Sequence, residues 1–155
     1  MAIGTDAGIE FFGTKDVLGT TTSAVTDGSF SAGTGDLVAW TNDDDAPEAA
    51  FALEFTTATT GDANSSLLLH ARLMNVGSAG TEDEEVPDAN FTQHFLGFFS
   101  HNNPSTGAQT AALRAVLPNT VTSQVYEFYV ENLTGQTISA GWELSVTPIS
   151  IGPHA

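Results

Sequence analysis

The sequence predicts an all-β protein, an antiparallel β-sandwich of jelly-roll type with roughly eight to nine strands. Three observations support this fold class: apolar residues recur at every second position, turn-forming residues separate the apolar runs, and helix signals are nearly absent. The chain has 155 residues and 41% of them are hydrophobic. A chain of this size buries about 68–70% of its unfolded surface, so we expect one domain over residues 1–155 with its own core.

The first half of the chain predicts five strands. Three short ones lie near residues 9–12, 26–30 and 37–41. In residues 49–57, Phe51, Leu53 and Phe55 share one face, which is typical of a strand with one buried side. A polar turn at 59–64 and a return strand at 66–76 complete the first predicted hairpin.

Two further hairpins are predicted in the second half. Strands at 91–100 and 110–117 flank the turn-rich residues 102–107. A strand at 125–131 and a return strand at 138–147 flank the turn at 132–136. Ile138, Ala140, Trp142, Leu144 and Val146 form one apolar face of the return strand, which we expect Pro148 to end. Residues 1–8 and 148–155, rich in Gly, Pro and small residues, are interpreted as arms that order on a neighbour.

An internal repeat relates residues 43–51 to residues 83–91 at an offset of 40. Each copy is an acidic loop followed by Pro, then by two predicted strands, of which the second carries an arginine, Arg72 or Arg114. Duplication and convergence on a common loop-to-strand solution both account for the pattern.

The charge balance excludes two classes of partner. Nineteen acidic residues against three Lys and Arg give a net charge of −16, which leaves no basic surface to bind nucleic acid or anionic membranes. The first twenty residues do not read as a secretory signal, so we expect synthesis in the cytoplasm.

The two acidic loops are the candidate metal site. Calcium accepts flexible loop carboxylates, and two solvated acidic loops are the alternative interpretation. The candidate calcium ligands are Asp43, Asp44, Asp45, Glu82, Asp83, Glu84 and Glu85.

No catalytic pattern is recognised, and we do not expect an enzyme. The chain has no Cys, and its histidines, at 70, 94, 101 and 154, show no zinc-ligand spacing. No Gly-x-Ser-x-Gly nucleophile elbow is present.

Candidate interface residues come from the arginines and the arms. Arg72 and Arg114, the only arginines, lie in the middle of strands, where each must face solvent or pair with a carboxylate; structural ion pairs and subunit contacts are both open. Ile3, Ile149 and Ile151 are the apolar residues of the arms. Trp142 is expected in the core, whereas Trp40, beside the first acidic loop, is expected to be partly exposed.

The segments at 126–132 (YEFYVEN), 134–142 (TGQTISAGW) and 151–155 (IGPHA) resemble small structural proteins of tailed bacteriophages, and the segment around 46–49 does so less closely. The resemblance implies a capsid decoration, or cement, protein that binds the major capsid protein on the virion surface, often as a trimer. Ten Phe in one small domain independently suggest a homo-oligomer, most simply a trimer.

A carbohydrate-binding module is the alternative function. In a β-sandwich of that class, aromatic side chains form the binding surface on one face or around the loops. The candidates are Trp40, Tyr126, Tyr129, Phe98 and Phe99.

Overall fold

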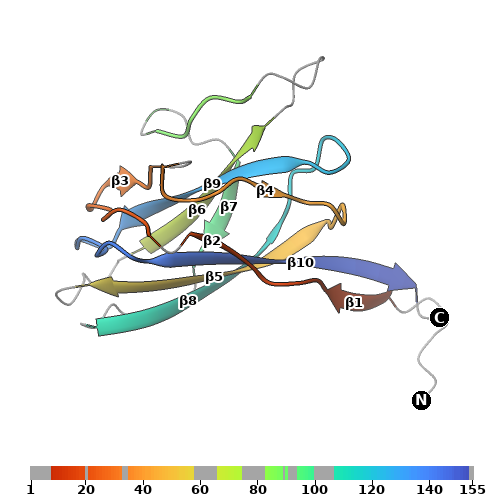
Figure 1. Cartoon of the computed structure of the whole chain (residues 1–155), viewed down its shortest axis with the longest axis horizontal. Coiled ribbons are helices and arrows are strands. Elements are labelled where there is room, and N and C mark those ends of the chain that lie inside the picture. The colour runs from red at the N-terminus through yellow and green to blue at the C-terminus, as the bar shows by residue number, and fades with distance from the viewer. Residues whose placement is uncertain are drawn as a thin grey trace.

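The protein is seen in a computed structural model that describes residues 8–19, 21–32, 35–57, 66–74, 83–88, 90, 94–99 and 107–153. Within these ranges there are ten strands in two antiparallel sheets and no α-helix (Figure 1). The all-β sandwich predicted from the sequence is therefore confirmed.

The first sheet, sheet A, contains the longest pairing among the described strands, between β5 and β8. Its order is β1-β10-β5-β8, and β2 also pairs with β10. The strands are β1 (Gly8–Phe12), β2 (Asp16–Gly19), β5 (Glu48–Thr57), β8 (Gly107–Val116) and β10 (Glu143–Pro153).

The second sheet, sheet B, has the order β3-β9-β6-β7, and β4 also pairs with β9. The strands are β3 (Ser29–Phe30), β4 (Trp40–Thr41), β6 (Ser66–Met74), β7 (Phe95–Phe98) and β9 (Val125–Leu133).

The strand order is that of a jelly roll. β1 and β2 share one position beside β10, and β3 and β4 share one position beside β9, so that the ten strands fill eight positions. Eight positions in two facing sheets of four are typical of this fold, and along the chain the positions alternate between the sheets except at β6 and β7, which pair in sheet B. The short β2 is the strand that the sequence analysis did not predict.

All three predicted hairpins are wrong, because the two strands of each pair lie in different sheets. In each pair one strand belongs to sheet A and the other to sheet B; the pairs are β5 and β6, β7 and β8, and β9 and β10. The segment between β5 and β6 spans 58–65, longer than the roughly two to five residues of a hairpin loop. The alternation of apolar and polar residues shows that a strand has one buried side. Strands of both sheets bury that side in the same core, so the alternation does not identify the partner strand.

The core lies between the sheets and consists of the alternating residues predicted for it. Phe51 of sheet A packs edge to face on Phe128 of sheet B at 5.1 Å between ring centroids, and Tyr126 stacks near Phe128 at 5.7 Å. Leu53 and Leu144 have no exposed surface. Each such side chain contributes roughly 1.5–3 kcal/mol by leaving water.

Strand β10 does not end at Pro148 but continues to Pro153, which corrects the predicted arm at 148–155. Residues 149–153 pair with β1, and Ile149 has no exposed surface. The Pro148 carbonyl accepts a hydrogen bond from the Gly13 N–H at 2.9 Å. Since the nitrogen and carbonyl of a strand residue point to the same side, the Pro148 nitrogen faces the break between β1 and β2, and its missing N–H costs no bond to β5. Of the other arm, residues 1–7 lie outside the described ranges.

Candidate interaction surfaces

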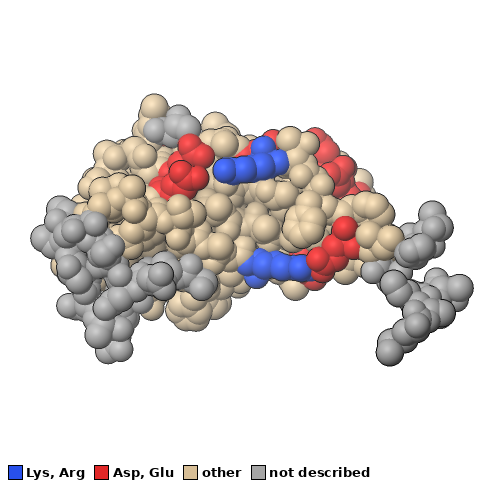
Figure 2. Space-filling model, turned by 90° about the horizontal axis from the view of Figure 1, so that it is seen from below, with Lys and Arg blue, Asp and Glu red and all other residues tan. Residues whose placement is uncertain are grey.

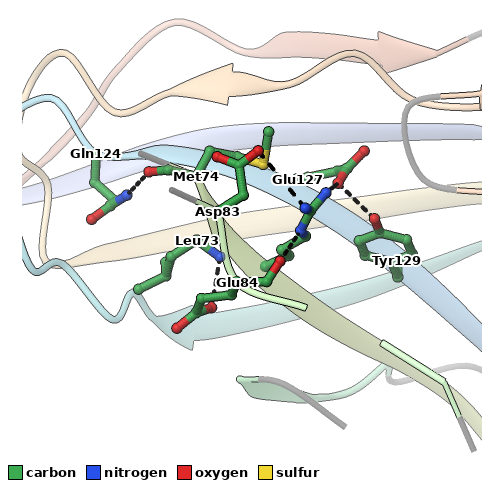
Figure 3. A network of polar contacts seen from close by, with 8 residues as sticks. Leu73, Met74, Asp83, Glu84, Gln124, Glu127 and Tyr129 are labelled. Atoms are coloured by element: carbon green, nitrogen blue, oxygen red, sulfur yellow. Dashed lines mark hydrogen bonds and ion pairs between the residues drawn. The ribbon is translucent and has the colours of Figure 1, made fainter. Parts of the chain in front are cut away.

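A buried polar network lies on the outer face of sheet B and is centred on Arg72 of β6. Its Nη1 donates to Glu127 Oε2 of β9 at 2.8 Å, and the Tyr129 hydroxyl donates to the same oxygen at 2.6 Å (Figure 3). The Glu127 side chain is 1% exposed and that of Arg72 is 18% exposed. A buried carboxylate needs such partners, because an unpaired charge away from water costs several kcal/mol.

The same arginine holds the acidic segment 83–88 beside the end of β6. Its Nε donates to the Glu84 carbonyl, and its Nη2 lies 3.7 Å from Asp83 Oδ2. Glu84 Oε2 accepts from the Leu73 N–H at 2.8 Å, and Glu84 Oε1 lies 2.9 Å from His94 Nε2. Figure 3 shows Asp83 and Glu84 close to Leu73 and Glu127. The second acidic loop is thus fastened to the sheet by groups of the chain itself.

The pKa values of this network follow from burial and pairing. Burial acts to lower the pKa of Arg72, but its hydrogen bond to Glu127 and the charge of that carboxylate outweigh burial and raise the pKa above its usual value. Burial, with the neighbouring Glu127, raises the pKa of Tyr129 well above its ordinary value. Arg72 and Tyr129 therefore keep their protons at neutral pH, and both donate hydrogen bonds to the Glu127 carboxyl group.

The candidate calcium ligands do not come together in the part of the chain that the structure describes. Asp83 and Glu84 face Arg72 and His94, whereas Asp45 Oδ1 accepts from the Ser123 N–H at 2.6 Å. Among the described residues there is no group of three or more His, Asp or Glu side chains arranged to hold a metal ion. Asp43, Asp44 and Glu85 are exposed, and Glu82 lies outside the described ranges.

The two histidines in the described residues, His70 and His94, each lie beside a carboxylate. His70 Nε2 lies 2.9 Å from Glu131 Oε2, and His70 is 1% exposed, so its ring does not reach solvent. His94 is bound to Glu84 as described above. His101 and His154 lie outside the described residues.

Arg114 of β8 lies on the outer face of sheet A and is also paired. Its Nη2 donates to Glu10 Oε1 of β1 at 2.6 Å, and its Nε donates to Glu48 Oε2 of β5 at 2.5 Å. The Arg114 side chain is 43% exposed. The hydrogen bond from Arg114 lowers the pKa of Glu10, so that both groups are charged at neutral pH.

Uncharged surface predominates on the face of the molecule shown in Figure 2, where each basic patch lies near acidic groups. Ion pairs account for both arginines.

The end of β10 and strand β1 form a two-stranded ribbon with exposed apolar residues on both of its faces. Residues 143–149 of β10 pair with β5, whereas residues 150–153 pair with β1 alone. In Figure 1 this ribbon projects beyond the other strands. Its exposed apolar side chains are Ile9 (38%), Phe11 (53%), Phe12 (62%) and Ile151 (57%).

The two faces of this ribbon differ in how firmly their aromatic residue is held. Phe12 shares its face with Ile151, while Phe11 lies on the other face, where a Cβ on Gly152 would come within 2.8 Å of its ring. The ring of Phe11 therefore packs on the bare backbone of Gly152. Phe12 and Ile151 are more exposed than Ile9 and Phe11 on the other face, so their face offers the larger exposed apolar side chains.

A second apolar surface lies on the outer face of sheet B. Phe30, His70, Phe95 and Phe98 form a row of ring contacts with centroid distances of 5.2, 5.5 and 5.1 Å. Phe95 is 47% exposed and Phe98 is 59% exposed.

Of the five aromatic residues considered for carbohydrate binding, only Phe98 is exposed. Trp40 is 6% exposed, which corrects the prediction of partial exposure: its ring packs on Tyr126 and Phe128, and its Nε1 donates to Asp16 Oδ2 at 2.9 Å. The rest are 3% exposed or less: Tyr126, Tyr129 and Phe99. These four side chains belong to the packing of the sandwich and are not available to stack on a sugar.

Sequence reasoning did not predict the burial of Glu127 and Tyr129, which lie on the face of β9 opposite to Tyr126 and Phe128. A tyrosine beside a glutamate on that face was the available signal, since a buried carboxylate commonly takes a hydroxyl donor. Ile151 is on the ribbon, Ile149 is buried, and Ile3 lies outside the described residues.

Comparisons with protein-family models and with curated proteins find no match to this chain. Within the described residues, no helix has the length and apolar character needed to cross a membrane.

Proposed function

We propose that this protein is a non-enzymatic structural protein of a tailed-phage virion, which binds the lattice of the major capsid protein as a decoration protein and stabilises the head. The observation that carries the proposal is the β1–β10 ribbon with Phe12 and Ile151 exposed at its surface. This exposed apolar ribbon supports the proposal together with the resemblance of the sequence to small structural proteins of tailed bacteriophages.

The ribbon is suited to a protein partner on physical grounds. Two strands that pair only with each other are marginally stable in water, and apolar residues on both faces gain free energy when a second surface covers them. Aromatic side chains are enriched at the centres of protein interfaces, where a few residues supply most of the binding energy. Phe12, 62% exposed, is the leading candidate for such a residue.

The alternative carbohydrate-binding function has less support. A jelly roll occurs in both viral capsid proteins and lectins, so the fold alone does not choose between them. Burial removes four of the five aromatic side chains on which that function was based, and Phe98 is the one that remains exposed.

The test is binding of the purified protein to shells assembled from the phage's major capsid protein. We expect the double variant Phe12→Ser/Ile151→Ser to bind about tenfold or more weakly, because two central apolar contacts are lost. Val38→Ser is the matched control, since Val38 is also 62% exposed but lies in the segment between β3 and β4.

Equal binding by the double variant and the wild type, with both proteins folded, would place the capsid contacts elsewhere. Failure of the wild-type protein to bind the shells, together with binding to a polysaccharide, would replace the proposal with the carbohydrate-binding function.

A further inference from the structure

The four lateral edges of the sandwich differ in how they are protected against pairing with another strand. Along one side, β1 and β2 are separated by residues 13–15, and β3 and β4 have two residues each. On the other side, β7 has four residues and its register with β6 shifts between Leu69 and His70. Short, interrupted or bulged edges are poor templates for pairing.

Strand β8 is the exception among the described strands. It has ten residues, and each of them is in unbroken register with β5, from Gly107 opposite Thr57 to Val116 opposite Glu48. Beside it in the other sheet, Gly97 of β7 has φ +151°, and a Cβ there would lie 2.8 Å from Leu113 Cδ1. Thus β7 packs against β8 from the facing sheet and is itself irregular, while β8 ends sheet A as a long and regular edge.

The hydrogen-bond pattern shows which backbone groups point to that open edge. The Leu117 N–H donates to the Pro47 carbonyl at 2.9 Å, which continues the β5–β8 register by one pair. In an antiparallel ladder the bonded residues alternate, so the odd-numbered residues of β8 face β5. The even-numbered residues then direct their N–H and C=O groups away from β5: Ala108, Thr110, Ala112, Arg114 and Val116.

The side chains of β8 do not obstruct the edge. The strand has no Asp, Glu, Lys or Pro, the residues with which proteins commonly protect an edge. Its one charged residue, Arg114, is bound to Glu48 and Glu10, which belong to strands on the β5 side. The guanidinium is therefore directed across sheet A and away from the open edge.

We propose that β8 is a self-association edge, which pairs antiparallel with β8 of a second copy of this chain across a two-fold axis at Ala112. This register places Ala112 opposite Ala112, Thr110 opposite Arg114 and Ala108 opposite Val116 of the other copy. All five outward-facing residues then meet outward-facing residues, and five hydrogen-bonded pairs form about ten hydrogen bonds. The two sheets A become one continuous sheet.

The edge matches itself, since pairing with its own copy sets every outward-facing residue against an outward-facing residue, and charge permits a second copy at this contact. Each chain has a net charge of −16, so copies can approach closely only where carboxylates are absent from the contact. β8 has none, and the register sets no like charges directly opposite each other. The pairing is isologous and closes as a dimer, in contrast to the trimer expected from the sequence. It does not depend on the proposed capsid function.

The absence of native cysteine allows a direct test of the register. In Ala112→Cys, the two thiols would face each other at a Cα separation of about 5.5 Å, within the range of a disulfide. We expect a disulfide-linked dimer on mild oxidation. Ala52→Cys is the matched control: Ala52 pairs with Ala112 in register, but the two copies of residue 52 would be three strand spacings apart, about 14 Å.

Light scattering and a proline variant complete the test. The wild-type protein should have twice the chain mass of 16.1 kDa, and its association should strengthen with added salt, which screens the charge. Ala112→Pro should be monomeric and remain folded, since it removes an N–H that faces the open edge and not one bonded to β5. A monomeric or trimeric wild-type protein, or equal cross-linking of Ala112→Cys and Ala52→Cys, would overturn the proposal.

Discussion

The two arginines each lie in the second predicted strand after a copy of the internal repeat, yet their surroundings differ. Arg72 is on the outer face of sheet B, where Glu127 is almost fully buried and the acidic segment 83–88 lies beside β6. Arg114 is on the outer face of sheet A, where its bonds to Glu10 and Glu48 remain exposed. An arginine thus pairs with a buried carboxylate on the outer face of sheet B and with exposed carboxylates on the outer face of sheet A.

The largest effect is expected from Arg72→Ala. It leaves the Glu127 carboxylate, 1% exposed, without its cation, and such losses cost about 3–5 kcal/mol. We expect Tm to fall by roughly 10 °C in calorimetry, whereas Arg114→Ala, the matched control, should lower it far less. Equal losses in the two variants would show that the two faces do not differ.

A companion variant separates the loss of the pair from the loss of packing. Arg72→Met/Glu127→Leu/Tyr129→Phe replaces the buried polar groups together with apolar ones. Because no charge or hydroxyl is then left unpaired, this variant should recover most of the lost stability.

The second prediction concerns alkaline pH. The chain has two tyrosines, and burial raises the pKa of Tyr126 to about 12 and that of Tyr129 higher still. The folded protein therefore keeps both protons when an unfolded chain has lost them near pH 10. The free energy of unfolding is at its full value below pH 10 and falls as the pH rises from there toward the folded-state values.

Spectrophotometric titration of tyrosinate checks this result, and it also compares the two faces. Tyr126 lies in the core, whereas Tyr129 is on the outer face of sheet B. A tyrosine that titrates near pH 10 in the folded protein, and is lost in Tyr129→Phe, would mean that this outer face is open to water.

The smallest effect is expected at the exposed pair on sheet A. The hydrogen bond from Arg114 holds the pKa of Glu10 below 4.5, so its contribution is present at neutral pH and is lost as the pH falls through the lowered value. In Arg114→Ala, an NMR titration should show the pKa of Glu10 returning toward 4.5. The accompanying loss of Tm should diminish with salt, and a loss that salt does not change would contradict a surface ion pair.

Local patterns predicted the strands well where one face is buried and the other is open. In β5, Phe51, Leu53 and Phe55 are buried and Glu54 is exposed, as the alternation indicates. In β9 both faces are covered, so Glu127 and Tyr129 are buried on the face opposite to Tyr126 and Phe128. Their burial depends on Arg72 and on residues far away in the sequence.

The partner of each strand could not be read from the sequence for a related reason. The hairpin interpretation paired β5 with β6, β7 with β8 and β9 with β10. In the structure β5 pairs with β8 and β10, and β9 pairs with β3, β4 and β6. Pro148 was likewise interpreted as the end of a strand. The sequence does not show that its nitrogen faces the gap between β1 and β2, where no N–H is needed. The candidate calcium ligands were chosen because acidic residues are dense in the two loops. In the structure Asp83 lies near Arg72, and Glu84 accepts a hydrogen bond from the Leu73 N–H.

The alternation of the long strands between sheets also determines how the chain can fold. Sheet A collects strands from Gly8 to Pro153, so a fragment that lacks β1 or β10 cannot contain the complete sheet A. The β5–β8 ladder forms only after the segment that contains β6 and β7 has closed into a loop, and this loss of chain entropy precedes the gain from pairing. Folding should therefore occur in milliseconds to seconds, typical of domains dominated by non-local strand pairs, and fragments cut between β6 and β8 should remain unfolded until both halves are present.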